Sequence, residues 1–82
     1  MMGPGKVRNT IRKLRFEAGE MTQQQLADQV GVTRQTIVAI EGAQYAPSLE
    51  LAFRISAAFN KPLEEIFRYE NGPSARSSRR EP

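Results

Sequence analysis

The sequence predicts an all-α protein, a compact bundle of five short helices. Two observations support this prediction. Apolar residues recur every three to four positions in five successive segments, and no segment shows the alternation of apolar and polar residues that marks a strand. Residues that commonly begin or end helices, such as Thr22, Gly31 and Ser48, stand between these segments. We therefore expect no sheet in the main body of the fold.

The first two expected helices are separated by a short loop. The first begins after Asn9 or Thr10, either of which can cap it, and ends at Gly19. The second begins at Thr22, whose hydroxyl suits an N-cap, and Gln25 three residues later completes a capping-box pattern. Their apolar positions are Val7, Ile11, Leu14 and Ala18 for the first helix and Leu26, Ala27 and Val30 for the second.

The other three helices are recognised in the same way. The third starts at the Thr33 cap, the fourth at the Ser48 cap, and the fifth is a short segment near Leu63. Their inward positions are expected to be Ile37 and Ile40, then Leu49, Ala52, Ile55, Ser56 and Phe59, and finally Leu63, Ile66 and Phe67. The predicted hydrophobic core comprises Leu14, Leu26, Val30, Ile37, Ile40, Ala52, Ile55 and Phe59.

One domain over residues 7–70 accounts for all five helices. Residues 1–6 contain glycine and proline without periodicity, and we expect a flexible N-terminus there. Residues 71–82 contain no large apolar side chain to offset the entropy of ordering, so we expect a disordered basic tail.

The composition argues against several classes of site. The chain has no cysteine and no histidine, which removes disulfides, the usual metal ligands and the commonest catalytic base. No carboxylate cluster or phosphate-binding glycine loop stands out, so we expect no enzymatic activity, metal, cofactor or small-molecule ligand. No apolar run reaches the roughly 18 residues of a membrane span, and no signal peptide is visible. We therefore expect a cytoplasmic protein with no membrane partner.

Basic residues gather toward both ends of the chain, whose net charge is +3. Such a distribution suits contact with phosphates, although ordinary solvated surface charges would give the same pattern. The segment from Thr22 to Glu41 is more informative. It holds two short helices joined by about three residues that include a glycine, which is the helix-turn-helix pattern. Ala27 is small where the helices would cross, and Gly31 suits a turn that needs positive φ. We interpret residues 33–41 as the recognition helix.

The first turn of that helix supplies the candidate base contacts. Arg34 can bind guanine and Gln35 can bind adenine through paired hydrogen bonds, while Thr33 and Thr36 can reach a base edge or a phosphate. Taken alone, the same four residues would be an ordinary solvated helix start. Gln23 opens the preceding helix, where free N–H groups favour a phosphate, although glutamine is also simply a good helix former.

These elements resemble the Cro and lambda-repressor type of helix-turn-helix regulators, also called the xenobiotic-response-element family, and especially its compact single-domain bacterial members. The matching stretches are IRKLR, MTQQQLADQVGVTRQTIVAIE, YAPSLELAFRISAAF and PLEEIF, within about residues 7–69. The resemblance implies a lambda-repressor-like fold that binds operator DNA as a homodimer. It implies a phosphate contact for Gln23 and places Thr33 to Thr36 at the groove. It also pairs Arg15 with Glu41. Without the resemblance, these two residues could be either an ion pair or two unrelated surface charges.

The chain departs from this family directly after Glu41. Members usually continue with Asn-Gly-Lys or a similar run, whereas this chain has Gly42, Ala43 and Gln44. Because Ala43 would be strained in a left-handed cap, we expect the third helix to end differently, with Gly42 as a candidate cap. The usual lysine contact to phosphate is absent. Gln44 is the candidate that replaces it, with the Tyr45 hydroxyl as the alternative.

The predicted function is sequence-specific binding of double-stranded DNA by a transcriptional regulator that acts as a repressor. So small a domain makes few base contacts, so we expect a homodimer on a palindromic operator. Several apolar residues exceed the needs of one small core and are candidates for the interface or for closing the base of the monomer, namely Leu51, Phe53, Ala58, Ile66, Phe67 and Tyr69. The alternative function is a protein-interaction module, such as an antitoxin-like partner with the same fold.

Overall fold

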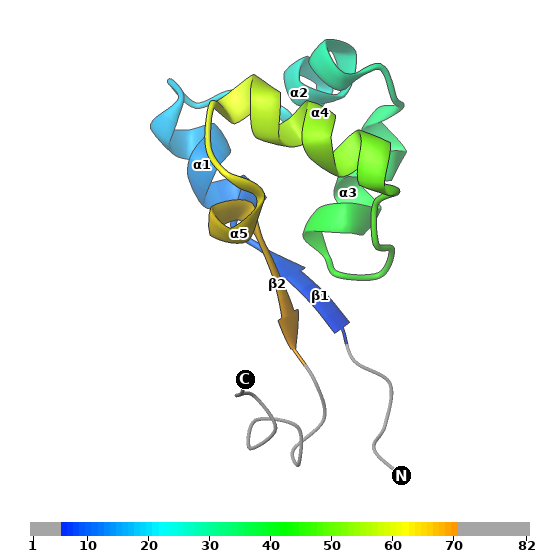
Figure 1. Cartoon of the computed structure of the whole chain (residues 1–82). Coiled ribbons are helices and arrows are strands. Elements are labelled where there is room, and N and C mark those ends of the chain that lie inside the picture. The colour runs from blue at the N-terminus through cyan, green and yellow to red at the C-terminus, as the bar shows by residue number, and fades with distance from the viewer. Residues whose placement is uncertain (1–5, 71–82) are drawn as a thin grey trace, which may run out of the picture.

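The computed structural model describes residues 6–70 and has a helical body with one small sheet. In Figure 1 the helices form the body, and the two strands run side by side away from it. The predicted body of five helices is confirmed; the expectations for residues 1–5 and 71–82 lie outside the described residues. The elements are β1 (Lys6–Asn9), α1 (Ile11–Glu17), α2 (Gln23–Val30), α3 (Arg34–Glu41), α4 (Leu49–Phe59), α5 (Leu63–Ile66) and β2 (Phe67–Glu70).

The sheet corrects the expectation that the fold has none. β1 and β2 pair in antiparallel fashion, with Val7 opposite Tyr69. Arg8 Nε donates to Glu70 Oε1 at 2.8 Å although 62 positions separate the two residues, and this hydrogen bond lowers the pKa of the Glu70 carboxyl. Strands of four residues are too short to show a period of two, and their pairing joins distant parts of the chain. Local sequence patterns therefore carry no signal for this sheet.

The core lies among the helices and follows most of the predicted positions. Phe59 is the exception, because it is only partly buried and packs against the edge of the core. Residues that were predicted for the core and are buried are Leu14, Leu26, Val30, Ile37, Ile40, Ala52 and Ile55. Further buried residues are Ile11, Ala27, Leu51 and Ile66. The burial of Leu51 and Ile66 removes both from the apolar residues that are free to serve an interface.

The rotation of α4 differs from the prediction. Leu49, expected to point inward, has an exposed fraction of 68%, whereas Leu51, expected outside the inward stripe, is buried with 7% exposed. α4 is apolar around much of its circumference, so more than one stripe has helical spacing. Packing against α2 and α5 decides which of these stripes is buried.

The starts of α2 and α4 agree with the cap residues in the sequence. At α1, Thr10 is the N-cap without a side-chain cap bond, and Asn9 Oδ1 accepts from the Ile11 N–H at 3.1 Å. Thr22 Oγ1 accepts from the Gln25 N–H at 2.9 Å, and Gln25 Oε1 accepts from the Thr22 N–H at 2.8 Å. These two bonds form the expected capping box of α2. Ser48 caps α4 by accepting from the Leu51 N–H at 3.1 Å.

The end of α3 shows how the chain accommodates the sequence Gly42-Ala43-Gln44. The expectation that α3 ends without a left-handed Ala43 is wrong. Gly42 is the C-cap but has an ordinary φ of −81°, and Ala43 takes the left-handed conformation with φ 59°. The Ala43 N–H donates to the Ile40 carbonyl and the Gln44 N–H to the Ala39 carbonyl, each at 2.9 Å. These are the two bonds of a Schellman motif, which is usually made with glycine at the left-handed position. Ala43 therefore carries backbone strain that the hydrogen bonds of the motif offset.

Replacing Ala43 by glycine should stabilise the protein. The left-handed conformation costs an L-residue about 1–2 kcal/mol, and the extra freedom of glycine in the unfolded chain offsets about 0.4–1 kcal/mol of the gain. We expect the free energy of unfolding, measured with urea, to rise by about 0.5–1 kcal/mol. In the middle of the same helix, Ala39→Gly should lower it by about 0.5–1 kcal/mol. Two changes of the same sign would contradict the left-handed assignment.

Candidate nucleic-acid interface

The candidate interface is built on the pair α2 and α3, which pack against each other through a tight turn. Gly31 occupies the turn with φ 79°, and its N–H donates to the Ala27 carbonyl at 2.8 Å. Ala27 itself is fully buried, which fits its predicted place where the two helices cross. Gly31 thus makes the turn with positive φ, and Ala27 allows α2 and α3 to cross closely, as the sequence predicted.

Thr33 and Thr36 are engaged in holding the start of α3. Thr33 Oγ1 accepts from the Thr36 N–H at 3.2 Å, and the two hydroxyls lie 3.1 Å apart. A side-chain cap of this kind satisfies one of the N–H groups left free at a helix start. Thr33 is exposed and Thr36 is partly buried.

Arg34 and Gln35 are the outward-facing long side chains of this first turn. Both are exposed, and within residues 6–70 neither side chain makes an ion pair or a hydrogen bond to another group. Nothing in the described fold occupies their donors, so both are available to a ligand.

Val38 belongs to the same face and was missed by sequence reasoning. It is 41% exposed and lies four residues after Arg34 and three after Gln35, the spacing that places side chains on one face of a helix. An exposed valine beside the candidate base contacts Arg34 and Gln35 can contact the methyl group of thymine. The signal that could have found it was helical spacing counted outward from Arg34 instead of inward from Ile37.

The predicted ion pair between Arg15 and Glu41 is confirmed. Arg15 Nε lies 2.6 Å from Glu41 Oε2 and Arg15 Nη2 lies 3.0 Å from Oε1, so the pair is bidentate. The side chains are only 15% and 10% exposed. Arg15 Nη1 also donates to the Met21 carbonyl at 2.8 Å, so one guanidinium connects α1, the loop before α2 and the last turn of α3.

Gln23 lies next to this ion pair. Its Nε2 donates to Glu41 Oε1 at 3.3 Å, which fixes the side chain at the start of α2. The Gln23 and Gln24 backbone N–H groups have no acceptor within the described part of the chain, as expected for the first turn of a helix. A phosphate contact by Gln23 thus has a backbone donor available even while its side chain is engaged.

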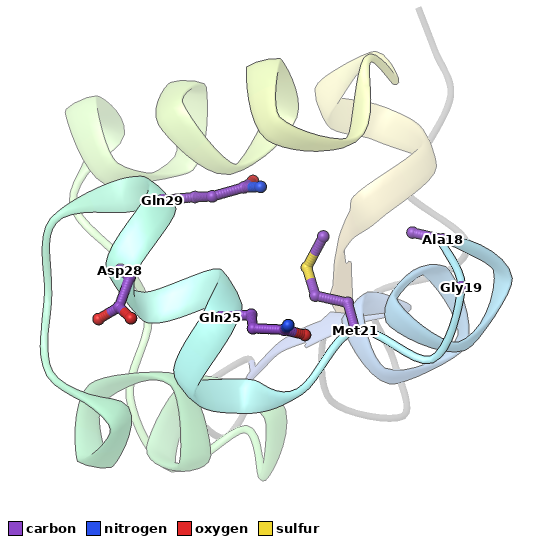
Figure 2. A pocket seen from close by; sticks show the side chains of 6 residues that line it. All are labelled: Ala18, Gly19, Met21, Gln25, Asp28 and Gln29. Atoms are coloured by element: carbon purple, nitrogen blue, oxygen red, sulfur yellow. The ribbon is translucent and has the colours of Figure 1, made fainter.

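Other polar residues of α2 face elsewhere. Gln25, Asp28 and Gln29 line, with Met21 and the end of α1, a separate hollow of about 430 Å³ (Figure 2). None of the residues proposed for DNA contact lines this hollow, and Gln25 is already used in the capping box.

Gln44 lies beyond the opposite end of α3 from Arg34. Its side chain is exposed, and the neighbouring Tyr45 is 49% exposed. α3 has eight residues, so about 12 Å of helix separates Gln44 from the polar first turn. The structure brings Gln23 and Arg34 together along one hollow, while Gln44 stands apart from both.

In the described residues no helix is long and apolar enough to cross a membrane. The same residues contain no group of three or more acidic or other ligating side chains that could hold a metal ion.

Comparison with known proteins places this geometry in a family. A helix-turn-helix family model matches residues 11–66. An HTH-type transcriptional regulator of Archaeoglobus fulgidus is 45% identical over 65 residues, which cover 79% of this chain and 91% of that protein. Another, from Methanothermobacter thermautotrophicus, is 52% identical over 62 residues, covering 74% and 88%. A crystal structure from Bacteroides fragilis, 22% identical, has the same fold, with a TM-score of 0.66 over 76% of this chain and 98% of the other.

Removing one partner of the Arg15–Glu41 pair should be costly. Glu41→Ala leaves a largely buried guanidinium without its carboxylate, and we expect the free energy of unfolding to fall by about 3 kcal/mol. The matched control is Glu50→Ala, which breaks an exposed pair with Arg54 and should cost less than about 1 kcal/mol.

A double variant separates charge from packing. Arg15→Met combined with Glu41→Leu removes both charges, so much of the lost stability should return in urea denaturation. Equal effects of Glu41→Ala and Glu50→Ala would show that the Arg15–Glu41 pair is as weak as a surface pair.

Proposed function

The chain belongs to the helix-turn-helix family, and from that membership we propose that it is a sequence-specific DNA-binding regulator of transcription that acts as a repressor. The observation that carries the proposal is the first turn of α3, where Arg34 and Gln35 are exposed with no partner in the described fold. The function is binding without catalysis, and we propose the cytoplasm as its location.

Base reading falls to the outward face of α3. The N-terminal residues of the second helix reach base edges when that helix lies in the major groove. Arg34 can donate to both O6 and N7 of guanine, Gln35 can pair with adenine, and Val38 can contact a thymine methyl group. Discrimination between sequences therefore rests on three neighbouring side chains.

Phosphate contacts position that helix on the duplex. Gln23 offers its backbone N–H at the start of α2, Thr33 is an exposed cap at the start of α3, and Gln44 follows the end of α3. Thr36, partly buried beside the Thr33 hydroxyl, can reach either the backbone or a thymine methyl group. Contacts of this kind set register and carry no sequence information directly.

We further propose that the protein binds a palindromic operator as a homodimer through an apolar groove. The groove has a volume of about 450 Å³ and is lined from β1, the loop before α4, α4, α5 and β2, by residues that include Val7, Pro47, Leu49, Leu63 and Phe67. Exposed Phe53 on α4 and Tyr69 on β2 add to the apolar surface of the same elements. A two-fold dimer would present two copies of α3 to half-sites about 34 Å apart.

The base-reading assignment predicts two different losses. On the best site found by selection from random duplexes, Arg34→Ala should cost about 1–3 kcal/mol of binding free energy and relax specificity at one base pair. Gln23→Pro removes the backbone N–H at the first position of α2, where proline is well tolerated, and should weaken binding to all duplexes by a similar factor, because a phosphate contact carries no sequence information. Binding isotherms on matched and singly mismatched duplexes measure both.

Two outcomes would count against this assignment. Equal losses for Arg34→Ala on cognate and random DNA would make Arg34 a backbone contact. Retention of full DNA binding by both variants would place the DNA contacts elsewhere on the protein, and a parent that binds no duplex DNA would favour a protein-interaction module.

The dimer assignment predicts that a charge in the groove separates the protomers. Leu49 is 68% exposed, so Leu49→Asp should leave the monomer folded but shift the sedimentation coefficient from dimer to monomer. The control is Phe16→Asp on α1, also 68% exposed but outside the groove, which should stay dimeric. A parent protein that sediments as a monomer at high concentration, or a dimeric Leu49→Asp variant, would overturn the assignment.

A further inference from the structure

The two ends of α3 are held in different ways. Its last turn is tied to α1 by the Arg15–Glu41 pair and to β1 by the Asn9 amide, which donates to the Ile40 carbonyl. Its first turn, which carries the candidate base contacts, follows directly on the turn that ends α2. The direction in which the base-contacting side chains point therefore depends on how firmly the turn between α2 and α3 is held.

A side chain of α4 reaches this turn. Arg54 Nη1 donates to the Val30 carbonyl at 3.1 Å, although 24 positions separate the two residues. Val30 is the last residue of α2, and its carbonyl receives no backbone N–H among the turn and cap bonds of the described residues. The guanidinium also stands at the negative end of the α2 dipole, where a positive charge is favoured. Arg54 thus caps the end of α2 from a helix that lies outside the helix-turn-helix pair.

Gly31 leaves room for this guanidinium. A Cβ atom added at Gly31 would lie 3.3 Å from Arg54 Nη1, which is closer than most real contacts of a Cβ atom. The N–H groups of Gly31 and Val32 both donate to the Ala27 carbonyl, so the turn itself offers no donor to the Val30 carbonyl. The glycine therefore serves the turn twice, through its positive φ and through the space that it leaves for Arg54.

Arg54 makes a second bond that can be removed separately. Its Nη2 lies 2.6 Å from Glu50 Oε2, one turn earlier on α4, and the two side chains are 51% and 74% exposed. An ion pair as exposed as this contributes little stability. The bond to Glu50 orients the guanidinium, and the bond to Val30 joins α4 to the turn.

We propose that Arg54 is a positioning residue for base recognition, which fixes the turn between α2 and α3 and so the direction of Arg34 and Gln35. The inference rests on the proposed DNA-binding function and adds to it a determinant of specificity on α4. Arg54 does not line the hollow that Gln23 and Arg34 share, and it acts through the turn without contacting DNA. Hydrogen bonds to base edges need exact alignment, whereas attraction to phosphates is long-ranged and independent of sequence. A loosened turn therefore lowers specific binding and spares non-specific binding.

The first test compares affinities for the selected site and for random duplexes. Arg54→Met keeps a long side chain but removes both donors. It should lower affinity for the selected site roughly tenfold and leave affinity for random DNA unchanged. The slope of log affinity against log salt should stay that of the parent, because no phosphate contact is lost.

Two further variants separate positioning from a general effect on the fold. Glu50→Gln removes the ion pair but keeps the bond to Val30, so it should retain the parent ratio of specific to random affinity. Arg54→Lys keeps a donor that can reach the same carbonyl and should restore most of that ratio. A smaller folded fraction would reduce both affinities by the same factor, so lost stability alone leaves the ratio unchanged.

A second measurement needs no DNA. In Arg54→Met, the amide hydrogens of Gly31 and Val32 should exchange with solvent several-fold faster than in the parent, because the turn opens more often. The Gly42 amide is the internal control, since it lies at the end of α3 that Arg15 and Asn9 hold. Its exchange should change no more than the global stability does.

The outcomes separate this inference from the function on which it depends. A parent protein that binds no duplex DNA would overturn the regulator function and, with it, the role of Arg54 in base recognition. A parent that binds its site selectively, while Arg54→Met keeps the parent ratio or the parent exchange at Gly31, would overturn only the role of Arg54. A reduced salt slope in Arg54→Met would make Arg54 a phosphate ligand. An equal fall in the ratio for Glu50→Gln would assign the effect to the ion pair in place of the bond to Val30.

Discussion

The arrangement of α1, α2 and α3 depends on the bidentate pair between Arg15 and Glu41. One guanidinium binds the last turn of α3 and the Met21 carbonyl of the loop that leads into α2. Because Gln23 donates to the same carboxylate, the start of α2 is tied to the end of α3 as well. A largely buried ion pair contributes little net stability after desolvation, but it strongly disfavours arrangements that leave either charge alone. Its main effect is therefore on the angles between α1, α2 and α3.

A second set of contacts closes the molecule around this pair. Asn9, at the end of β1, donates its side-chain amide to the Ile40 carbonyl at 2.7 Å, and the Thr10 N–H donates to the Ile66 carbonyl at 2.9 Å. The small sheet thus connects the start of α1 to the end of α5 and to the last turn of α3. In a domain with so small a core, these few non-local bonds limit how far α3 can tilt.

The polar residues of the interface divide into two groups by what occupies their donors. Thr33, Thr36 and the Gln23 side chain are bonded within the protein and hold helix ends in place. Arg34 and Gln35 have no such partner in the described chain and can bond a nucleic acid without breaking an internal contact. A pre-organised frame with free donors on its surface reduces the ordering cost that binding would otherwise incur.

The sequence by itself determined the features that depend on neighbouring residues. The Thr22 capping box, the Gly31 turn and the polar first turn of α3 each rest on residues a few positions apart, so local patterns were sufficient to predict them. The family resemblance added the pair of Arg15 with Glu41. Tertiary structure decided the rest, because the deciding contacts join distant residues. α4 is apolar on several sides, so only packing could choose Leu51 over Leu49 for burial. The pairing of β1 with β2 and the position of Arg34 near Gln23 at the start of α2 depend on how separate elements are oriented in space, which no local period records.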